Sequence, residues 1–131
     1  MLIKDFYRIV SLNQIDQGKY LIKVFINENH DIFKGHFPGN PVMPGVSIMQ
    51  IIKEVAEQIT QCQLQMQTVS NVKFMALINP YVNPELQIDL ELLDAEDVEV
   101  KVKGAVSFDR TIALKLSTSY KIVEQTIEVG I

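Results

Sequence analysis

The sequence predicts an α+β fold in which one long central helix is wrapped by a curved antiparallel sheet of six strands. Only one segment of the 131 residues has the apolar spacing of a helix, and strand-like segments lie on both sides of it. A single sheet with one apolar face can cover a helix of about four turns. We therefore expect one domain over residues 1–131, and the unpaired edges of its sheet favour oligomerisation.

Two strands are expected before the helix, and they differ in how clearly they alternate. Residues 5–12 have the composition of a strand but alternate poorly. Residues 20–26 alternate clearly, and Gly18 before them is a plausible turn residue. A long loop over residues 28–45 follows. The apolar face of the second strand consists of Tyr20, Ile22, Val24 and Ile26.

The helix is expected from Val46 to about Gln61, because its apolar residues recur at intervals of three and four. Pro44 and Gly45 lie just before its start, where they do not interrupt the backbone hydrogen bonds. The apolar residues that define the helical face are Ile48, Met49, Ile51, Ile52, Val55, Ala56 and Ile59.

Four strands are expected after the helix, where the apolar period changes to two. Pro80 and Pro84 mark the connection after the first of them, and Asp109-Arg110 predicts a hairpin turn before the last. The expected strands cover residues 72–78, 86–92, 98–106 and 112–120.

Composition excludes several classes of protein. A net charge of −4 argues against a nucleic-acid-binding domain, which needs a clustered positive field. The longest clean apolar run, residues 74–78, is far shorter than a membrane helix requires, so we expect a cytoplasmic protein that does not contact the membrane. Cys62, the single cysteine, cannot form an internal disulfide and is expected to be a small buried apolar residue. His30 and His36 have no further ligands at zinc spacing, so no metal site is expected.

The loop over residues 35–45 is rich in glycine, which allows unusual backbone angles, and in proline, which restricts them. It holds three of the six glycines and three of the five prolines, unlike a flexible Gly/Ser linker. His36 is its only titratable residue and is suited to proton transfer near neutral pH. A histidine held beside an acyl chain could remove a proton alpha to a thioester carbonyl. Such a step also needs donors for the developing enolate oxygen, and the start of the helix at Gly45 and Val46 supplies free backbone N–H groups.

The stretch HDIFKGHFPGNPVMPGV, residues 30–46, resembles the signature of the 3-hydroxyacyl-acyl-carrier-protein dehydratases, which have the hotdog fold. The resemblance is strong over these residues and looser over the rest of the chain. It implies that His36 is the catalytic base, that the Val42 carbonyl holds its imidazole, and that the Gly45 N–H binds the thioester carbonyl. The complete set of expected substrate-binding residues is Phe37, Val42, Met43, Gly45 and Val46.

The resemblance also implies partners. The substrate would arrive on the phosphopantetheine arm of acyl carrier protein, in fatty acid or related lipid or polyene biosynthesis. No bound cofactor or metal is implied. Active sites would lie at a dimer interface, in a homo-oligomer (a dimer or a trimer of dimers) or in a heterodimer with a second hotdog chain.

Gln50 departs from this pattern, because the resembling enzymes have Glu or Asp at the matching helix position. An amide cannot give up a proton as an acid, and losing a general acid typically costs about 10²- to 10⁴-fold in rate. Glu54 lies one helical turn later on the same face. Our hypothesis is that Glu54 partly replaces the missing acid, directly or through a water, so the catalytic set is His36, Gln50 and Glu54.

Other interpretations remain open at this stage. The chain could be a non-catalytic hotdog subunit that binds acyl chains or completes a partner's active site, with Gln50 as the supporting feature. It could also be a hotdog thioesterase, although those enzymes usually use a carboxylate to activate water. Gln50 and Glu54 could simply form a solvated polar stripe on the helix. His30 could be a loop residue near the entrance of the acyl-chain tunnel that the resemblance implies.

Overall fold

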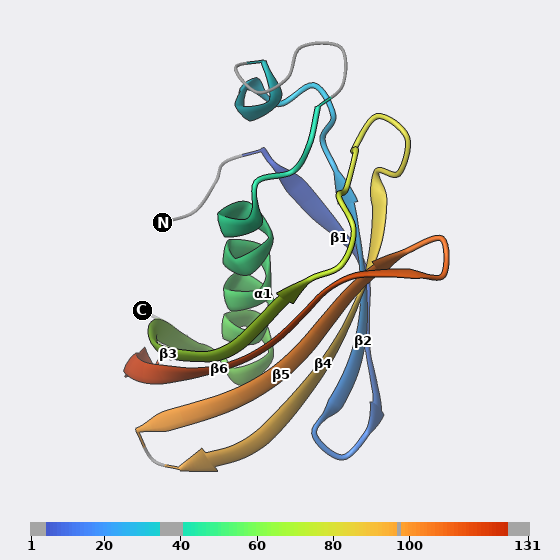
Figure 1. The fold of residues 1–131 in the computed structure, drawn as a ribbon. Helices are drawn as coiled ribbons and strands as arrows, with labels where there is room; N and C mark the ends of the chain where they lie inside the picture. Colours follow the sequence, from blue (N-terminus) through green and yellow to red (C-terminus); the bar gives the residue numbers. More distant parts are fainter. Residues whose placement is uncertain (1–4, 35–40, 97, 126–131) are drawn as a thin grey trace.

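The computed structural model describes residues 5–34, 41–96 and 98–125, which form one α-helix, one short 3₁₀ helix and six strands (Figure 1). In chain order the elements are β1 (Tyr7–Asp16), β2 (Lys19–Ile26), η1 (Asp31–Phe33), α1 (Gly45–Thr60), β3 (Cys62–Phe74), β4 (Glu85–Glu96), β5 (Glu99–Phe108) and β6 (Thr111–Gln125).

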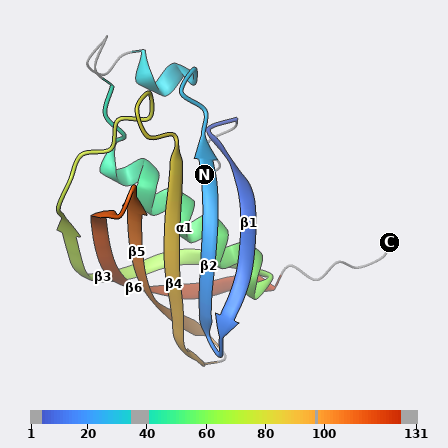
Figure 2. The same ribbon diagram turned by 90° about the vertical axis from the view of Figure 1, so that its right-hand side faces the viewer.

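All six strands belong to one antiparallel sheet in the order β1-β2-β4-β5-β6-β3. The sheet curves around α1, which lies on its inner side in both ribbon views (Figures 1 and 2). The predicted fold class, with one helix wrapped by six antiparallel strands, is confirmed. β1 and β3 are the two edges of the sheet.

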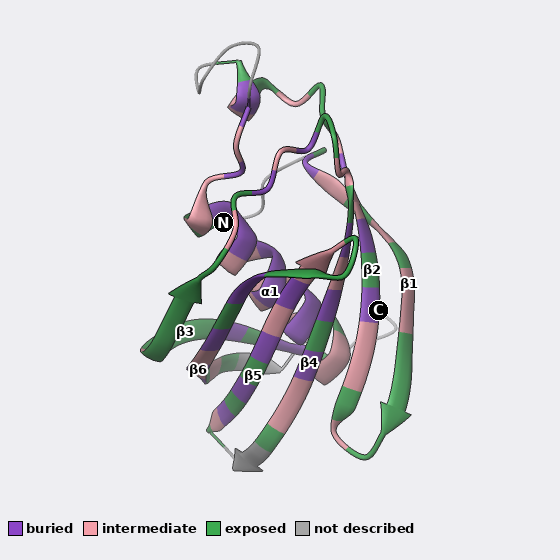
Figure 3. Ribbon diagram, turned by 45° about the vertical axis from the view of Figure 1, so that its right-hand side comes forward, coloured by how far each residue is buried: buried purple, intermediate pink, exposed green. Residues whose placement is uncertain are grey.

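The core lies between α1 and the inner face of the sheet (Figure 3). Ile52 and Val55 of α1 are fully buried, and so are Val24 of β2 and Val106 of β5. A Cβ at Gly104 of β5 would lie 3.1 Å from the Leu90 side chain and 3.8 Å from that of Ile52. The absence of a side chain at this position therefore makes room for Leu90 of β4, which lies beneath α1 in the core.

The helix begins and ends within one residue of its predicted bounds. Pro44 is its N-cap, and Gln61 ends it in the left-handed conformation, with φ of 56°. β3 follows at once, at Cys62. The Glu57 carboxylate fastens this junction, because it accepts a hydrogen bond from the Leu64 N–H at 2.8 Å.

The strand predicted at residues 72–78 is wrong in its bounds, because β3 covers Cys62–Phe74. The first half of β3 alternates between apolar Cys62, Leu64 and Met66 and the glutamines between them, a strand signal that the prediction missed. Its second half is exposed on both faces, as an edge strand allows. The alternating residues 75–78 instead form a connection. Within it, the Met75 N–H donates to the Ala113 carbonyl at 2.8 Å, and Ile78 is buried.

The first strand also differs from its prediction, since β1 runs from Tyr7 to Asp16 rather than over residues 5–12. Its pairing with β2 is shifted between Ile9 and Ser11 and again between Gln14 and Asp16. Each shift moves the following side chains relative to the partner strand, which explains the poor alternation.

The remaining strands contain their predicted segments, except that Val98 precedes β5 and is exposed. Asp109 and Arg110 both have positive φ, 46° and 65°, as expected in a two-residue hairpin turn. Gly18 has φ of 71°, and an added Cβ would lie 2.8 Å from the Leu92 carbonyl oxygen, so this turn requires glycine.

The loop expected over residues 28–45 contains the short helix η1. Neither helix in the described part of the chain has the length and apolar composition needed to span a membrane.

Candidate active site at the start of helix α1

Two of the predicted site residues, His36 and Phe37, lie outside the described residues. The described part of the predicted site begins at residue 41 and continues through α1. It contains the remaining expected residues, namely Val42, Met43, Gly45, Val46, Gln50 and Glu54.

Residues 41–44 bring the chain to the start of α1 and are held in place by hydrogen bonds. The Met43 side chain is buried, and its N–H donates to the Ile78 carbonyl at 2.9 Å. The Pro44 carbonyl accepts from the Ser47 N–H at 3.0 Å and from the Ser47 hydroxyl at 2.6 Å. The Ser47 hydroxyl thus fixes the first turn of the helix.

The backbone N–H groups of Gly45 and Val46 point to the open end of α1. No acceptor for them is found within residues 5–34, 41–96 and 98–125, and no side chain caps the helix. Free N–H groups at a helix start carry partial positive charge. This geometry can stabilise negative charge that develops on a thioester oxygen.

Phe74, at the end of β3, lies against Gly45. A Cβ built on Gly45 would come within 2.7 Å of the tip of the Phe74 ring, so this contact exists because residue 45 has no side chain. The Phe74 ring is nevertheless 57% exposed. One side of the ring therefore covers the helix start and the other faces outward.

An apolar cavity of about 380 Å³ opens at this place. It brings together two predicted substrate-binding residues, Met43 and Gly45. The side chain of Val46 is 77% exposed and does not line the cavity, and half-buried Val42 lies just outside it in the segment that leads to the helix. The lining consists of Met43, Gly45, Ile48, Phe74, Met75, Ala76, Leu77 and Ile78.

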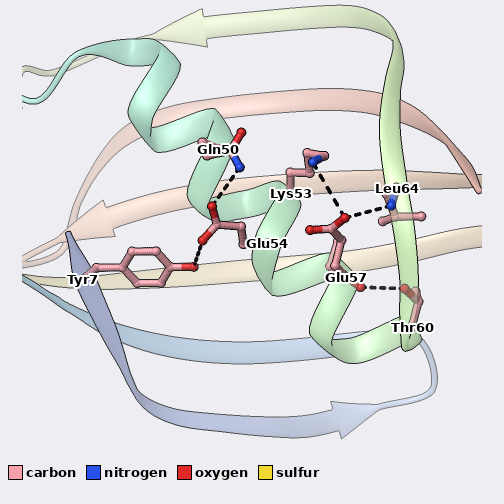
Figure 4. Close-up of polar contacts among 8 residues, drawn as sticks. Tyr7, Gln50, Lys53, Glu54, Glu57, Thr60 and Leu64 are labelled. Carbon is pink, nitrogen blue, oxygen red and sulfur yellow. Dashed lines mark hydrogen bonds and ion pairs between the residues drawn. The ribbon is translucent and has the colours of Figure 1, made fainter. Parts of the chain in front are cut away.

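Gln50 and Glu54 form a hydrogen-bonded pair on α1 (Figure 4). The Gln50 Nε2 donates to Glu54 Oε2 at 2.8 Å, and the hydroxyl of Tyr7 on β1 donates to Glu54 Oε1 at 2.8 Å. Burial, followed by the hydrogen bond to Glu54, holds the pKa of Tyr7 well above its ordinary value. Tyr7 therefore stays a neutral donor at physiological pH.

Among the described residues, Gln50 and Gly45 line different hollows. Gln50 lines a second groove of about 650 Å³ between α1 and the start of β3, whose other lining residues include Lys53, Glu57 and Leu64. The two halves of the predicted site thus open into different hollows of the single chain.

The family to which the chain belongs follows from its sequence. Residues 12–113 match the sequence model of the ApeI-like family, described as ApeI dehydratase. The chain belongs to this family. A FabZ 3-hydroxyacyl-acyl-carrier-protein dehydratase of Caulobacter vibrioides is 29% identical over 105 residues, which are 73% of this chain and 65% of the relative. The FabZ of Bartonella quintana is 35% identical over 94 residues, or 66% of this chain and 58% of the relative. The match thus spans less than two thirds of these relatives' own length.

Solved structures show that this ApeI-like chain has the hotdog fold. The dehydratase heterocomplex ApeI:P from Xenorhabdus doucetiae matches with a TM-score of 0.71 and 19% identity, over 87% of this chain and 96% of the other. A hypothetical thioesterase from Streptococcus pneumoniae, solved with coenzyme A, matches with a TM-score of 0.65 and 9% identity, over 92% and 88%. At these identities the likeness concerns the fold alone.

Two residues that contact the predicted site were not expected from the sequence. Tyr7 belongs to the strand that alternates poorly, and nothing in the sequence connects it to Glu54. Phe74 was expected only as a strand residue. The Gln50–Glu54 pair, in contrast, is visible in the sequence as a polar stripe at a spacing of four.

The remaining sequence candidates have structural roles. His30 is the N-cap of η1, where its Nδ1 accepts from the Ile32 N–H at 3.1 Å and its ring packs edge-on against Phe6. Cys62 is buried, as predicted, and its thiol donates to the Thr60 carbonyl at 3.4 Å. In the part of the chain that the structure describes, no three His, Cys, Asp or Glu residues are grouped as a metal site.

Proposed function

We propose that this ApeI-like chain dehydrates a 3-hydroxyacyl thioester carried on acyl carrier protein to the trans-2-enoyl thioester, in fatty acid or related lipid or polyene biosynthesis. The observation that carries the proposal is the loop GHFPGNPVMPG, which ends at the free N–H groups of Gly45 and Val46 beside an apolar cavity. The FabZ relatives, which are 3-hydroxyacyl-acyl-carrier-protein dehydratases, support the same reaction and the same carrier.

In the proposed reaction His36 takes the proton from C2 of the substrate. The electron pair of the broken C–H bond forms the C2–C3 double bond, and the C3–O bond breaks. The leaving oxygen takes the proton back from the His36 imidazolium and departs as water, which restores neutral His36. The Gly45 N–H stabilises the enolate-like thioester oxygen, and the Val42 carbonyl orients the imidazole through its other N–H.

We further propose that the active chain is paired. β3 is an edge of the sheet and carries apolar side chains near its end that are largely exposed, among them Phe74 and, just beyond, Leu77. Exposed edges and apolar patches of this kind favour association. Pairing through this edge would bring the Gly45 cavity of one chain toward the Gln50 groove of another. The partner is a second copy or, by analogy with the Xenorhabdus dehydratase heterocomplex, a different dehydratase chain.

The test is turnover of a 3-hydroxyacyl-acyl-carrier-protein substrate by the purified chain, beside a His36→Ala control. We expect enoyl product from the wild type and a loss of about 10²- to 10⁴-fold in the control. Folded protein with no turnover would contradict the proposal. The mass of the protein in solution, measured by light scattering, tests the pairing, and a monomer that is fully active would refute it.

A second function is favoured by one observation. Gln50 replaces the carboxylate of the resembling enzymes, and such a chain fits a non-catalytic subunit that binds acyl chains or completes a partner's site. Binding of acyl-carrier-protein without turnover, with activity restored by a second hotdog chain that has Glu or Asp at the matching position, would identify this function. Release of free thiol from the same substrates would instead identify a thioesterase.

A further inference from the structure

A chain of three side chains links the sheet edge to the proposed active site. Tyr7 on β1 donates to one oxygen of Glu54, and Gln50 donates to the other, both at 2.8 Å. All three residues are half-buried, and their side chains point toward one another (Figure 4). Two donors on the two oxygens hold the Glu54 carboxyl group in one orientation.

No cation pairs with Glu54 among the described residues. Lys53, the cation next in the sequence, forms its ion pair with Glu57 at 3.7 Å, and Glu57 also accepts from the Leu64 N–H. Among the described residues no ion pair involves Glu54. The carboxylate is therefore satisfied by the neutral donors of Tyr7 and Gln50.

This arrangement fixes the orientation of the Gln50 amide. A flipped amide would place its oxygen against a carboxylate oxygen, which is repulsive, so Nε2 faces Glu54 and Oε1 faces away (Figure 4). The Oε1 acceptor and the second N–H of Nε2 then remain for a ligand. An amide held in this way can accept a hydrogen bond from a hydroxyl group.

We propose that Tyr7 is a positioning residue and Glu54 an anchor, which together orient Gln50 so that its amide binds the 3-hydroxyl group of a substrate held in the Gly45 cavity of a paired chain. This inference rests on the proposed function. It gives Glu54 a role different from the partial acid that the sequence suggested, because both of its carboxyl oxygens are engaged by Tyr7 and Gln50. The proton for the leaving hydroxyl then comes from His36, and Gln50 aligns the C3–O bond for departure.

The first test measures binding, so that it does not depend on turnover. Dissociation constants for a 3-hydroxyacyl and a 2-enoyl pantetheine thioester would be measured by calorimetry in a His36→Ala background, with and without Tyr7→Phe. We expect Tyr7→Phe to weaken binding of the 3-hydroxyacyl compound by about 10-fold, as for loss of a hydrogen bond to a charged group. Binding of the enoyl compound, which has no hydroxyl, should not change. Equal weakening of both would show a merely structural role and overturn the proposal.

The matched control is Tyr20→Phe, a half-buried tyrosine on the neighbouring strand β2 whose hydroxyl makes neither hydrogen bond to Glu54. It should leave the ratio of the two dissociation constants unchanged. A change in that ratio as large as in Tyr7→Phe would overturn the assignment to Tyr7.

The second test measures the environment of the Gln50 side-chain amide directly. The side-chain amide signals of Gln50 in the ¹⁵N NMR spectrum should shift in Tyr7→Phe and in Glu54→Gln but not in Tyr20→Phe. Unchanged Gln50 signals overturn the positioning role even in an active enzyme. Shifted signals support it even if the wild type lacks dehydratase activity, in which case the proposed function fails and the positioning role remains.

The third test separates an anchor from an acid. A residue that must carry a proton gives the pH–rate profile an alkaline limb. If Glu54→Gln lowers kcat and leaves the shape of the pH–rate profile unchanged, Glu54 acts as an anchor. Disappearance of the limb in this variant would make Glu54 the proton donor and overturn the proposal.

Discussion

Tyr120→Phe is expected to stabilise the protein. Tyr120 is completely buried on the inner face of β6, and its hydroxyl makes no well-formed hydrogen bond among the described residues. The Thr118 hydroxyl interacts with it only weakly, because it donates its proton to the Thr68 carbonyl at 2.9 Å. A buried polar group without a partner costs about 1 to 3 kcal/mol. Removing the oxygen leaves a small void that offsets part of this gain, so we expect a net increase of about 1 kcal/mol in the free energy of unfolding.

For a chain of 131 residues the unfolding entropy is about 280 cal/mol/K, so this gain raises Tm by about 3 to 4 °C. The chain has no Trp, so circular dichroism at a fixed protein concentration is the suitable assay. A Tm that falls by about 2 °C or more would refute the reasoning, because it would show that the hydroxyl makes a stabilising hydrogen bond in solution.

The same residue links stability to alkaline pH. Burial raises the pKa of Tyr120 to about 12, from 10.0 for an ordinary tyrosine. The unfolded chain therefore loses its phenolic proton first, and stability falls as pH rises between these values, by about 3 kcal/mol in total. Urea titrations should show that the advantage of Tyr120→Phe over the wild type grows between about pH 9 and pH 11, and a constant difference would contradict this.

Three further variants test other parts of the structure. Gly45→Ala places a Cβ against the Phe74 ring, which is exposed enough to move. We therefore expect kcat/KM for dehydration to fall about 10-fold while Tm stays within about 3 °C of wild type. Unchanged kcat/KM would show that the substrate does not use this space. Gln61→Gly removes the cost of a left-handed helix end and should raise the unfolding free energy by about 0.5 to 1 kcal/mol in urea titrations; a decrease would mean that the hydrogen bond of its side chain to the Gln58 carbonyl outweighs the backbone strain. The double variant Gln50→Glu/Glu54→Gln puts the carboxylate where the resembling enzymes have it and keeps an amide–carboxylate pair. We expect its kcat to rise by about 10-fold or more. No rise would show that a carboxylate at position 50 does not act as the acid in this chain.

The sequence predicted the elements whose signals are local. The apolar stripe of α1 follows its own residues, and the alternation of β2, β4, β5 and β6 follows their inward faces, so these elements lie where expected. The two edge strands carry this signal over only part of their length. β1 is shifted twice against β2, so its bounds could not be read from alternation. The start of β3 does alternate, at Cys62, Leu64 and Met66, and was missed, whereas its exposed second half has no inward face to mark it.

The predicted site contains one pair that the structure confirms and other residues whose roles stay predictions. Gln50 and Glu54 were expected to share a helix face because four residues separate them, and their hydrogen bond confirms that they do. The roles of His36 and Phe37 stay predictions, since both residues lie outside the described part of the chain. The catalytic role of Glu54 stays a prediction as well, and the structure supplies the contacts through which it can be tested.

By itself, the sequence determined the fold class, the single wrapped helix and the loop that leads to Gly45. Tertiary structure alone decided that Tyr7 holds Glu54, that Phe74 covers Gly45, and that Gly45 and Gln50 open into different hollows. The physical reason is the distance along the chain. Periodicity reports which way a side chain points from its own element, whereas contacts between distant elements depend on strand order, register shifts and the curvature of the sheet.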